Sequence, residues 1–129
     1  MRKELQGKKL LSADIRAHSV KLGEIEALLA SETAETTARI GLFFGPSVAG
    51  YRAFVDAIGL DLNRALLAGH EIAWNRPFEP DERVRAELYL TDYTEKNGAE
   101  IGVVEARFFA ENGEVIQTQR TTFIERAVR

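Results

Sequence analysis

A chain of 129 residues, of which 45% are hydrophobic and 29% charged, is typical of a single globular domain over residues 1–129 and unlike a disordered or membrane-spanning protein. The formal net charge of −3 argues against a concentrated basic surface, so we expect no nucleic-acid partner. The absence of Cys excludes disulfides, thiolate metal sites and cysteine nucleophiles, and we expect neither a metal nor a cofactor. No apolar run near the N-terminus has the length of a signal peptide or a membrane span, which predicts a cytoplasmic protein without a membrane partner.

The N-terminal part of the sequence predicts one strand and one short helix. Alternating residues in ADIRAHSVKL, residues 13–22, predict the strand, and His18 within it is interpreted as a solvated or edge residue. Apolar residues at helical spacing in EIEALLA, residues 24–30, predict an amphipathic helix. The pattern of residues 31–40 indicates no particular element.

The stretch GPSVAGYRAFVDAIGLD predicts a central helix over about residues 46–59. Pro46 suits the first helical turn, and Gly59 suits a left-handed end. Only Arg52 and Asp56 are charged, so we expect the helix to be buried over most of its circumference. The apolar residues that share one face are Val48, Tyr51, Phe54, Val55 and Ile58.

The C-terminal half predicts a three-stranded antiparallel meander over about residues 82–94, 99–111 and 114–126. Asn97-Gly98 and Asn112-Gly113 separate these runs, and Asn-Gly favours the type I′ hairpin turn, in which both central residues have positive φ. Strands this long are expected to curve. The sequence therefore predicts an α+β hot-dog fold, in which a long curved antiparallel sheet wraps around one buried helix. The residues expected on the inner face are Val84, Ala86, Leu88 and Leu90 in one strand and Gly102, Val104, Ala106 and Phe108 in the next.

Residues of about 42–125 resemble MaoC-like dehydratases of the hot-dog fold. In that family a strand ends in an Arg-Pro step and turns through Pro-Gly-Asp before the meander. Arg76-Pro77 matches the step, and Pro80-Asp81-Glu82 stands where Pro-Gly-Asp is usual. Pro77 and Pro80 are accordingly interpreted as bend residues, and Trp74 as a packing residue near an interface.

The resemblance implies hydration of an enoyl thioester, or the reverse dehydration, by an Asp and a His that act on one water molecule. The family carries them before the central helix in a pattern like Asp-x-Asn-Pro-x-His. The matching segment here, ASETAETTARIGLFFGPS, contains no Asp, Asn or His. General acid–base groups contribute a factor of about 100 to 10,000 in rate. Our first hypothesis is therefore a protein that binds acyl-CoA or acyl-carrier-protein thioesters and is inactive alone or acts with a catalytic partner.

For thioester binding, the resemblance points to the start of the central helix, where unpaired backbone N–H groups suit a carbonyl oxygen. The expected substrate-binding residues are Gly45, Pro46, Ser47, Val48 and Tyr51. Hot-dog subunits commonly join through the strand that here covers about residues 67–75. We therefore expect a homodimer, or a heterodimer with a catalytic hot-dog subunit.

Two alternatives from other functional classes remain. A thioesterase would activate water with Glu32, Glu35 or Asp56, although Arg52 stands one turn before Asp56 and offers it a structural ion pair. His70 is a further candidate base, but its neighbour Glu71 is expected to point to the opposite face of the strand. The other alternative is a structural dimer without enzymatic activity.

Overall fold

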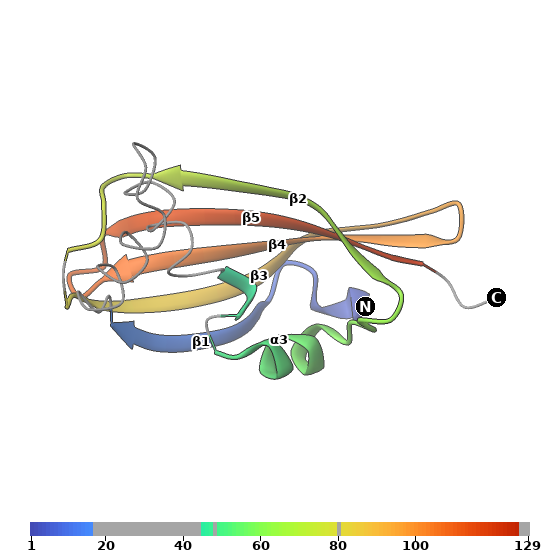
Figure 1. Cartoon of the computed structure of the whole chain (residues 1–129), viewed down its shortest axis with the longest axis horizontal. Helices are drawn as coiled ribbons and strands as arrows, with labels where there is room; N and C mark the ends of the chain where they lie inside the picture. The colour runs from blue at the N-terminus through green and yellow to red at the C-terminus, as the bar shows by residue number, and fades with distance from the viewer. Residues whose placement is uncertain (17–44, 48, 80, 127–129) are drawn as a thin grey trace, which may run out of the picture.

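A computed structural model describes residues 1–16, 45–47, 49–79 and 81–126, which form one antiparallel five-stranded sheet in the order β1-β3-β4-β5-β2 (Figure 1). The strands are β1 (Lys9–Arg16), β2 (Ala65–Trp74), β3 (Arg83–Lys96), β4 (Ala99–Ala110) and β5 (Val115–Arg126). The helical elements of the described residues are the 3-10 helices η1 (Lys3–Leu5) and η2 (Gly45–Ser47) and the α-helix α3 (Tyr51–Ile58). The strands β1 and β2 form the two edges of the sheet.

The predicted meander is confirmed as β3, β4 and β5, and the first of its two turns is as predicted. Asn97 and Gly98 have φ of 53° and 76°, the left-handed pair that a type I′ turn needs. The second turn differs, because Gly113 has a φ of 87° but Asn112 does not have a positive φ. Ala110 accepts the N–H of Gly113 at 2.9 Å, as in a longer loop that ends in a left-handed glycine.

The inner face of the sheet is the one that the sequence pattern predicts. The alternating residues Val84, Ala86, Leu88 and Leu90 of β3 and Gly102, Val104, Ala106 and Phe108 of β4 are all buried. The helix α3 lies beside β1 (Figure 1) and packs on this inner face, where the rings of Phe54 and Phe123 of β5 lie 5.3 Å apart. The chain therefore has the predicted arrangement of a curved sheet with one helix on its concave side.

The end of the central helix is predicted correctly, whereas its start is not. Gly59 is left-handed with a φ of 70°, and its N–H binds the Val55 carbonyl at 2.9 Å. The helix begins at Tyr51 rather than Pro46, because Gly50 has a φ of 94°, which no residue of an α-helix adopts. Phe54 and Ile58 are buried while Arg52 and Asp56 are exposed, so α3 buries one face rather than most of its circumference.

The N-terminal strand starts earlier than predicted. The strand β1 begins at Lys9 and pairs with β3, with Ala13 opposite Ala86 and Ile15 opposite Val84. The rest of the predicted strand, His18 and the predicted helix at residues 24–30 lie outside the described residues.

Candidate functional site

A row of buried polar side chains runs along the concave face of β5. Gln117, Gln119 and Thr121 are each fully shielded from solvent. In the register of the sheet, they lie between Phe108, Ala106 and Val104 of β4 on one side and Trp74, Ile72 and His70 of β2 on the other. A buried polar group costs free energy unless it is hydrogen-bonded. A polar atom of this row that has no partner in the protein is therefore a candidate for binding a ligand. We call these three residues with His70 the β5 polar row.

A relay of hydrogen bonds connects η2 to this row. The backbone N–H of Gly45 donates to Gln119 Oε1 at 2.7 Å, and Gln119 Nε2 donates to Gln117 Oε1 at 2.6 Å. The relay ends at Gln117 Nε2, for which the described part of the chain provides no acceptor. The β5 polar row therefore presents one buried amide donor next to apolar and aromatic side chains.

Gly45 is a glycine because η2 lies directly against the sheet. A Cβ atom at this position would come within 2.5 Å of Ala106 Cβ and 2.9 Å of Gln119 Oε1. The expectation that the N–H of Gly45 is unpaired is wrong, because Gln119 already accepts it. Pro46 is buried in η2, Val48 lies outside the described residues, and nothing is described of the side chains of Ser47 and Tyr51.

His70 is the titratable member of the β5 polar row. Its Nδ1 lies 2.8 Å from Thr121 Oγ1, and burial lowers the pKa of His70 below 6.5, so the imidazole is neutral near neutral pH. Glu71 is exposed and lies opposite Arg120 in the register, on the other face of β2, as the alternation predicts. The structure therefore places His70 beside the Thr121 hydroxyl on the inner face.

The carboxylates considered from the sequence are not part of this row. Glu32 and Glu35 lie outside the described residues. Asp56 is exposed on α3, and the ion pairs of the described residues do not include the expected pair with Arg52, so that prediction is wrong. Both side chains extend into solvent, where an ion pair on a helix surface contributes little.

Three aromatic rings close the end of the row near Gln117. The Trp74 ring meets Phe78 edge-on at 5.5 Å, and Phe78 meets Phe108 edge-on at 5.8 Å. Both geometries are favoured between aromatic rings. Trp74 is thus confirmed as a packing residue.

The Arg-Pro step and the Pro-Asp-Glu turn are bonded to each other. Arg76 forms a fork with Glu82, with Nη1 at 3.0 Å from Oε1 and Nη2 on Oε2, and its Nε lies 3.3 Å from Glu114 Oε1. The hydrogen bond with Glu82 raises the pKa of Arg76 and lowers that of the carboxyl. Asp81 has a φ of 59°, a left-handed conformation that Asp tolerates better than most residues, where the resembling family has Gly. This fork joins the end of β2 to the start of β3.

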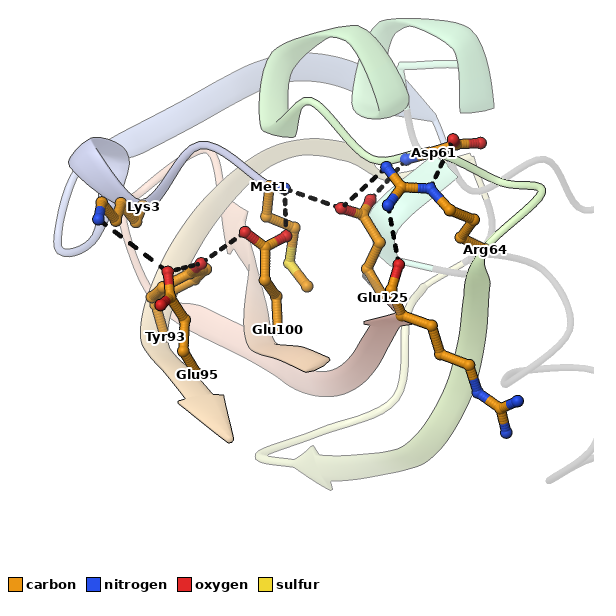
Figure 2. A network of polar contacts seen from close by, with 9 residues as sticks. Met1, Lys3, Asp61, Arg64, Tyr93, Glu95, Glu100 and Glu125 are labelled. Carbon is orange, nitrogen blue, oxygen red and sulfur yellow. Dashed lines mark hydrogen bonds and ion pairs between the residues drawn. The ribbon is translucent and has the colours of Figure 1, made fainter. Parts of the chain in front are cut away.

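A second polar cluster lies at the other end of the sheet (Figure 2) and was not predicted from the sequence. The Met1 ammonium group binds Glu100 Oε2 at 2.8 Å and Glu125 Oε1 at 3.1 Å. Arg64 binds Asp61 at 2.9 Å, and the backbone N–H of Asp61 donates to Glu125 at 2.6 Å. Met1, Arg64, Glu100 and Glu125 border an open groove of about 670 Å³.

The charge of Glu100 is stabilised by its neighbours in this cluster. Burial alone would raise the pKa of Glu100, but hydrogen bonds from the Met1 ammonium group and Tyr93 outweigh it and lower the pKa to about 2. The Met1 ammonium group binds both Glu100 of β4 and Glu125 of β5, so the cluster ties the N-terminal segment to these two strands. We interpret it as a structural feature.

Among the described residues, no group of three His, Asp or Glu side chains converges on a point where a metal ion would bind. Within the same part of the chain, the helices lack the length and apolar character needed to cross a membrane.

The strand order around one helix defines a hot-dog protein. The model of the family described as FAS1-like, dehydratase domain region, matches residues 8–119, so the chain belongs to this family. Among curated protein sequences, none is significantly similar to it.

Solved structures of dehydratases and hydratases share the fold. The HadBC (3R-hydroxyacyl-ACP dehydratase) complex from Mycobacterium tuberculosis has a TM-score of 0.68 at 12% identity, with 96% of this chain and 99% of that chain covered. The MaoC-like dehydratase from Rhodospirillum rubrum has a TM-score of 0.58 at 18% identity, with 96% and 94% covered. The (R)-hydratase from A. caviae involved in PHA biosynthesis has a TM-score of 0.59 at 17% identity, with 95% and 98% covered.

Sequence reasoning missed Gln117, Gln119 and Thr121. The signal was present in EVIQTQRTTFIER, because these three residues alternate in phase with Phe123, which faces the core. Polar residues at such positions were not recognised as buried because both faces of this strand carry Thr, Gln or Arg, which leaves no hydrophobic contrast to reveal the inner face.

Proposed function

We propose that this chain is an acyl-thioester-binding subunit of a hot-dog dehydratase, which lacks the Asp/His pair and acts with a catalytic hot-dog partner. The observation that carries the proposal is the β5 polar row, a line of amides, a hydroxyl and a neutral imidazole within an apolar concave surface. Such groups hold and orient a carbonyl in an acyl chain. The described members of the row include no ionised carboxylate.

The family supports a role in dehydration, and one structural neighbour supports a role in a complex. The chain belongs to a dehydratase domain family, and the M. tuberculosis neighbour is a complex described as a 3R-hydroxyacyl-ACP dehydratase. A subunit without the acid–base pair is expected to contribute the shape and polarity of the acyl channel while the partner supplies the proton transfers. Acyl groups on coenzyme A or on carrier protein both fit this role.

The experiment that tests this function follows both binding and chemistry. The purified chain is incubated with enoyl and saturated acyl-CoA thioesters of several lengths, binding is measured by native mass spectrometry, and every product is identified by mass. We expect bound thioester that is recovered unchanged. Hydrated product would contradict the proposal, and its loss in His70→Gln would identify His70 as a replacement base. Free acid with coenzyme A would favour the thioesterase, and an absence of binding would favour the structural dimer.

The edge strand β2 is the surface that we propose for subunit pairing. Among the described strands β2 pairs only with β5, so its outer edge presents backbone N–H and C=O groups without sheet partners, and such an edge is a template for another strand. Leu66 and Leu67 at its start are 52% and 57% exposed. Covering these two side chains would add apolar burial to the backbone pairing.

We expect light scattering to show that the chain is a dimer. We expect the double variant Leu66→Glu/Leu67→Glu to be a folded monomer, because a dimer paired through β2 would have to bury two carboxylates. Leu62→Glu is the matched control, since Leu62 is 56% exposed but precedes β2. A monomeric wild type, or equal dissociation by the control, would contradict pairing through β2.

A further inference from the structure

The end of the relay from Gly45 has the polarity of a ligand-binding group. We propose that Gln117 Nε2 donates a hydrogen bond to the carbonyl oxygen of the bound acyl group, and that Gln119 keeps the Gly45 N–H occupied so that the oxygen binds at Gln117 instead. This inference rests on the proposed function and specifies where within the site the thioester is held.

The direction of the relay follows from its first member. A backbone N–H only donates, so the Gln119 amide must turn Oε1 toward Gly45 and Nε2 toward Gln117. Gln117 must then turn Oε1 toward Gln119. With both hydrogen bonds in place, the atom left at the end is therefore the Gln117 amide nitrogen, a donor that accepts no proton and binds no cation.

The burial of this donor indicates that something other than solvent is its partner. Gln117 is 0% exposed, and Nε2 finds no acceptor in the described part of the chain. Buried side-chain amides are nearly always hydrogen-bonded, because an unsatisfied donor loses its hydration without compensation. A ligand oxygen placed here would restore the missing bond.

The surroundings of Gln117 select the chemistry of that ligand. Across the register Gln117 lies between Trp74 of β2 and Phe108 of β4, and Phe78 contacts both rings. A phosphate or carboxylate would need a cation for its charge, which the neighbouring rings do not supply. A neutral carbonyl attached to an apolar chain matches a single amide donor beside aromatic walls.

The test compares two ligands that differ by one oxygen. Decanoyl-coenzyme A carries the thioester carbonyl, and S-decyl-coenzyme A has a methylene in its place. Titration calorimetry with the full chain is expected to give about tenfold tighter binding of the thioester, as for one buried hydrogen bond. Gln117→Met removes the donor at similar length, so we expect the preference to disappear while the affinity for the thioether stays unchanged.

Thr118→Val is the control, because it changes a residue of β5 next to Gln117 whose side chain points to the opposite face of the sheet. We expect this variant to keep the preference for the thioester. If Gln117→Met does not fold, the side-chain amide resonances of wild-type Gln117 provide the readout, and they are expected to shift with the thioester but not with the thioether.

The outcomes separate this inference from the function on which it rests. Equal affinity of wild type for both ligands, or a preference that survives Gln117→Met, would overturn the role of Gln117 while leaving acyl-thioester binding intact. An amide resonance that responds equally to both ligands would do the same. If wild type binds neither ligand, the proposed function fails, and the inference fails with it.

Discussion

Gly45→Ala is expected to lower the free energy of unfolding by about 2 kcal/mol, within the usual range for overpacking. The added Cβ would lie 2.5 Å from Ala106 Cβ, a distance that real side chains do not show, and Ala106 belongs to the central strand β4 and has no rotamer to change. The 3-10 helix η2 must therefore move away from the sheet, which also breaks the hydrogen bond from Gly45 to Gln119. Urea unfolding followed by circular dichroism measures the loss.

A second substitution tests whether the contact between Gly45 and Ala106 causes this loss of stability. Ala106→Gly alone should cost about 1 kcal/mol, because glycine in a strand loses more chain entropy on folding. In the double variant Gly45→Ala/Ala106→Gly the methyl group has room, so the loss should be smaller than the sum of the single effects, with a coupling of about 1 kcal/mol or more. Strictly additive losses would show that the Gly45–Ala106 contact does not decide the residue at position 45.

Glu125→Ala is expected to cost about 3 kcal/mol, because the polar cluster around Met1 then keeps its cations without their central carboxylate. Glu125 is 4% exposed and accepts hydrogen bonds from both the Met1 ammonium group and the Asp61 backbone (Figure 2). Its removal leaves the Met1 ammonium group with Glu100 as its remaining carboxylate and takes the acceptor from the Asp61 N–H, and the loss of a partner by a buried charge and by a backbone donor is costly. Thermal unfolding and urea unfolding both report the change.

Glu95→Ala serves as the control for this cluster, since Glu95 has 60% of its side chain exposed and lies 4.0 Å from Lys3. A surface carboxylate of this kind contributes within about 0.5 kcal/mol. If Glu125→Ala were no more destabilising than Glu95→Ala, the cluster would have no structural role.

The sequence predicts the meander well because its signals are local. Alternation in β3 separates Val84 and Leu88 from their charged neighbours, and Asn97-Gly98 fixes where the strand reverses. The predicted start of α3 is wrong because glycine adopts positive and negative φ about equally. The sequence around Gly50 therefore does not specify its φ of 94°. Local patterns therefore locate strands more reliably than they locate a glycine that interrupts a helix.

The candidate site was only partly predictable. The resemblance directed attention to Gly45, which does border the β5 polar row, but the partner of its N–H is Gln119, far away in the sequence. The same holds for Met1 and Glu125, which meet only because β5 returns beside the N-terminal segment. Contacts between such distant residues depend on register and curvature, which composition and spacing do not specify.

The close approach of η2 to Ala106 leaves no room for a methyl group at one point of the concave face of the sheet, which carries two groups of aromatic rings. One group contains the rings of Trp74, Phe78 and Phe108 near Gln117, and the other contains the Phe54–Phe123 pair under α3. No space for a methyl group exists between Gly45 and Ala106, so an alkyl chain, which is no thinner than a methyl group, cannot pass between η2 and β4. Under the proposed binding at Gln117, an acyl group would not extend through this contact, and the glycine at position 45 would be a wall on that side of the site.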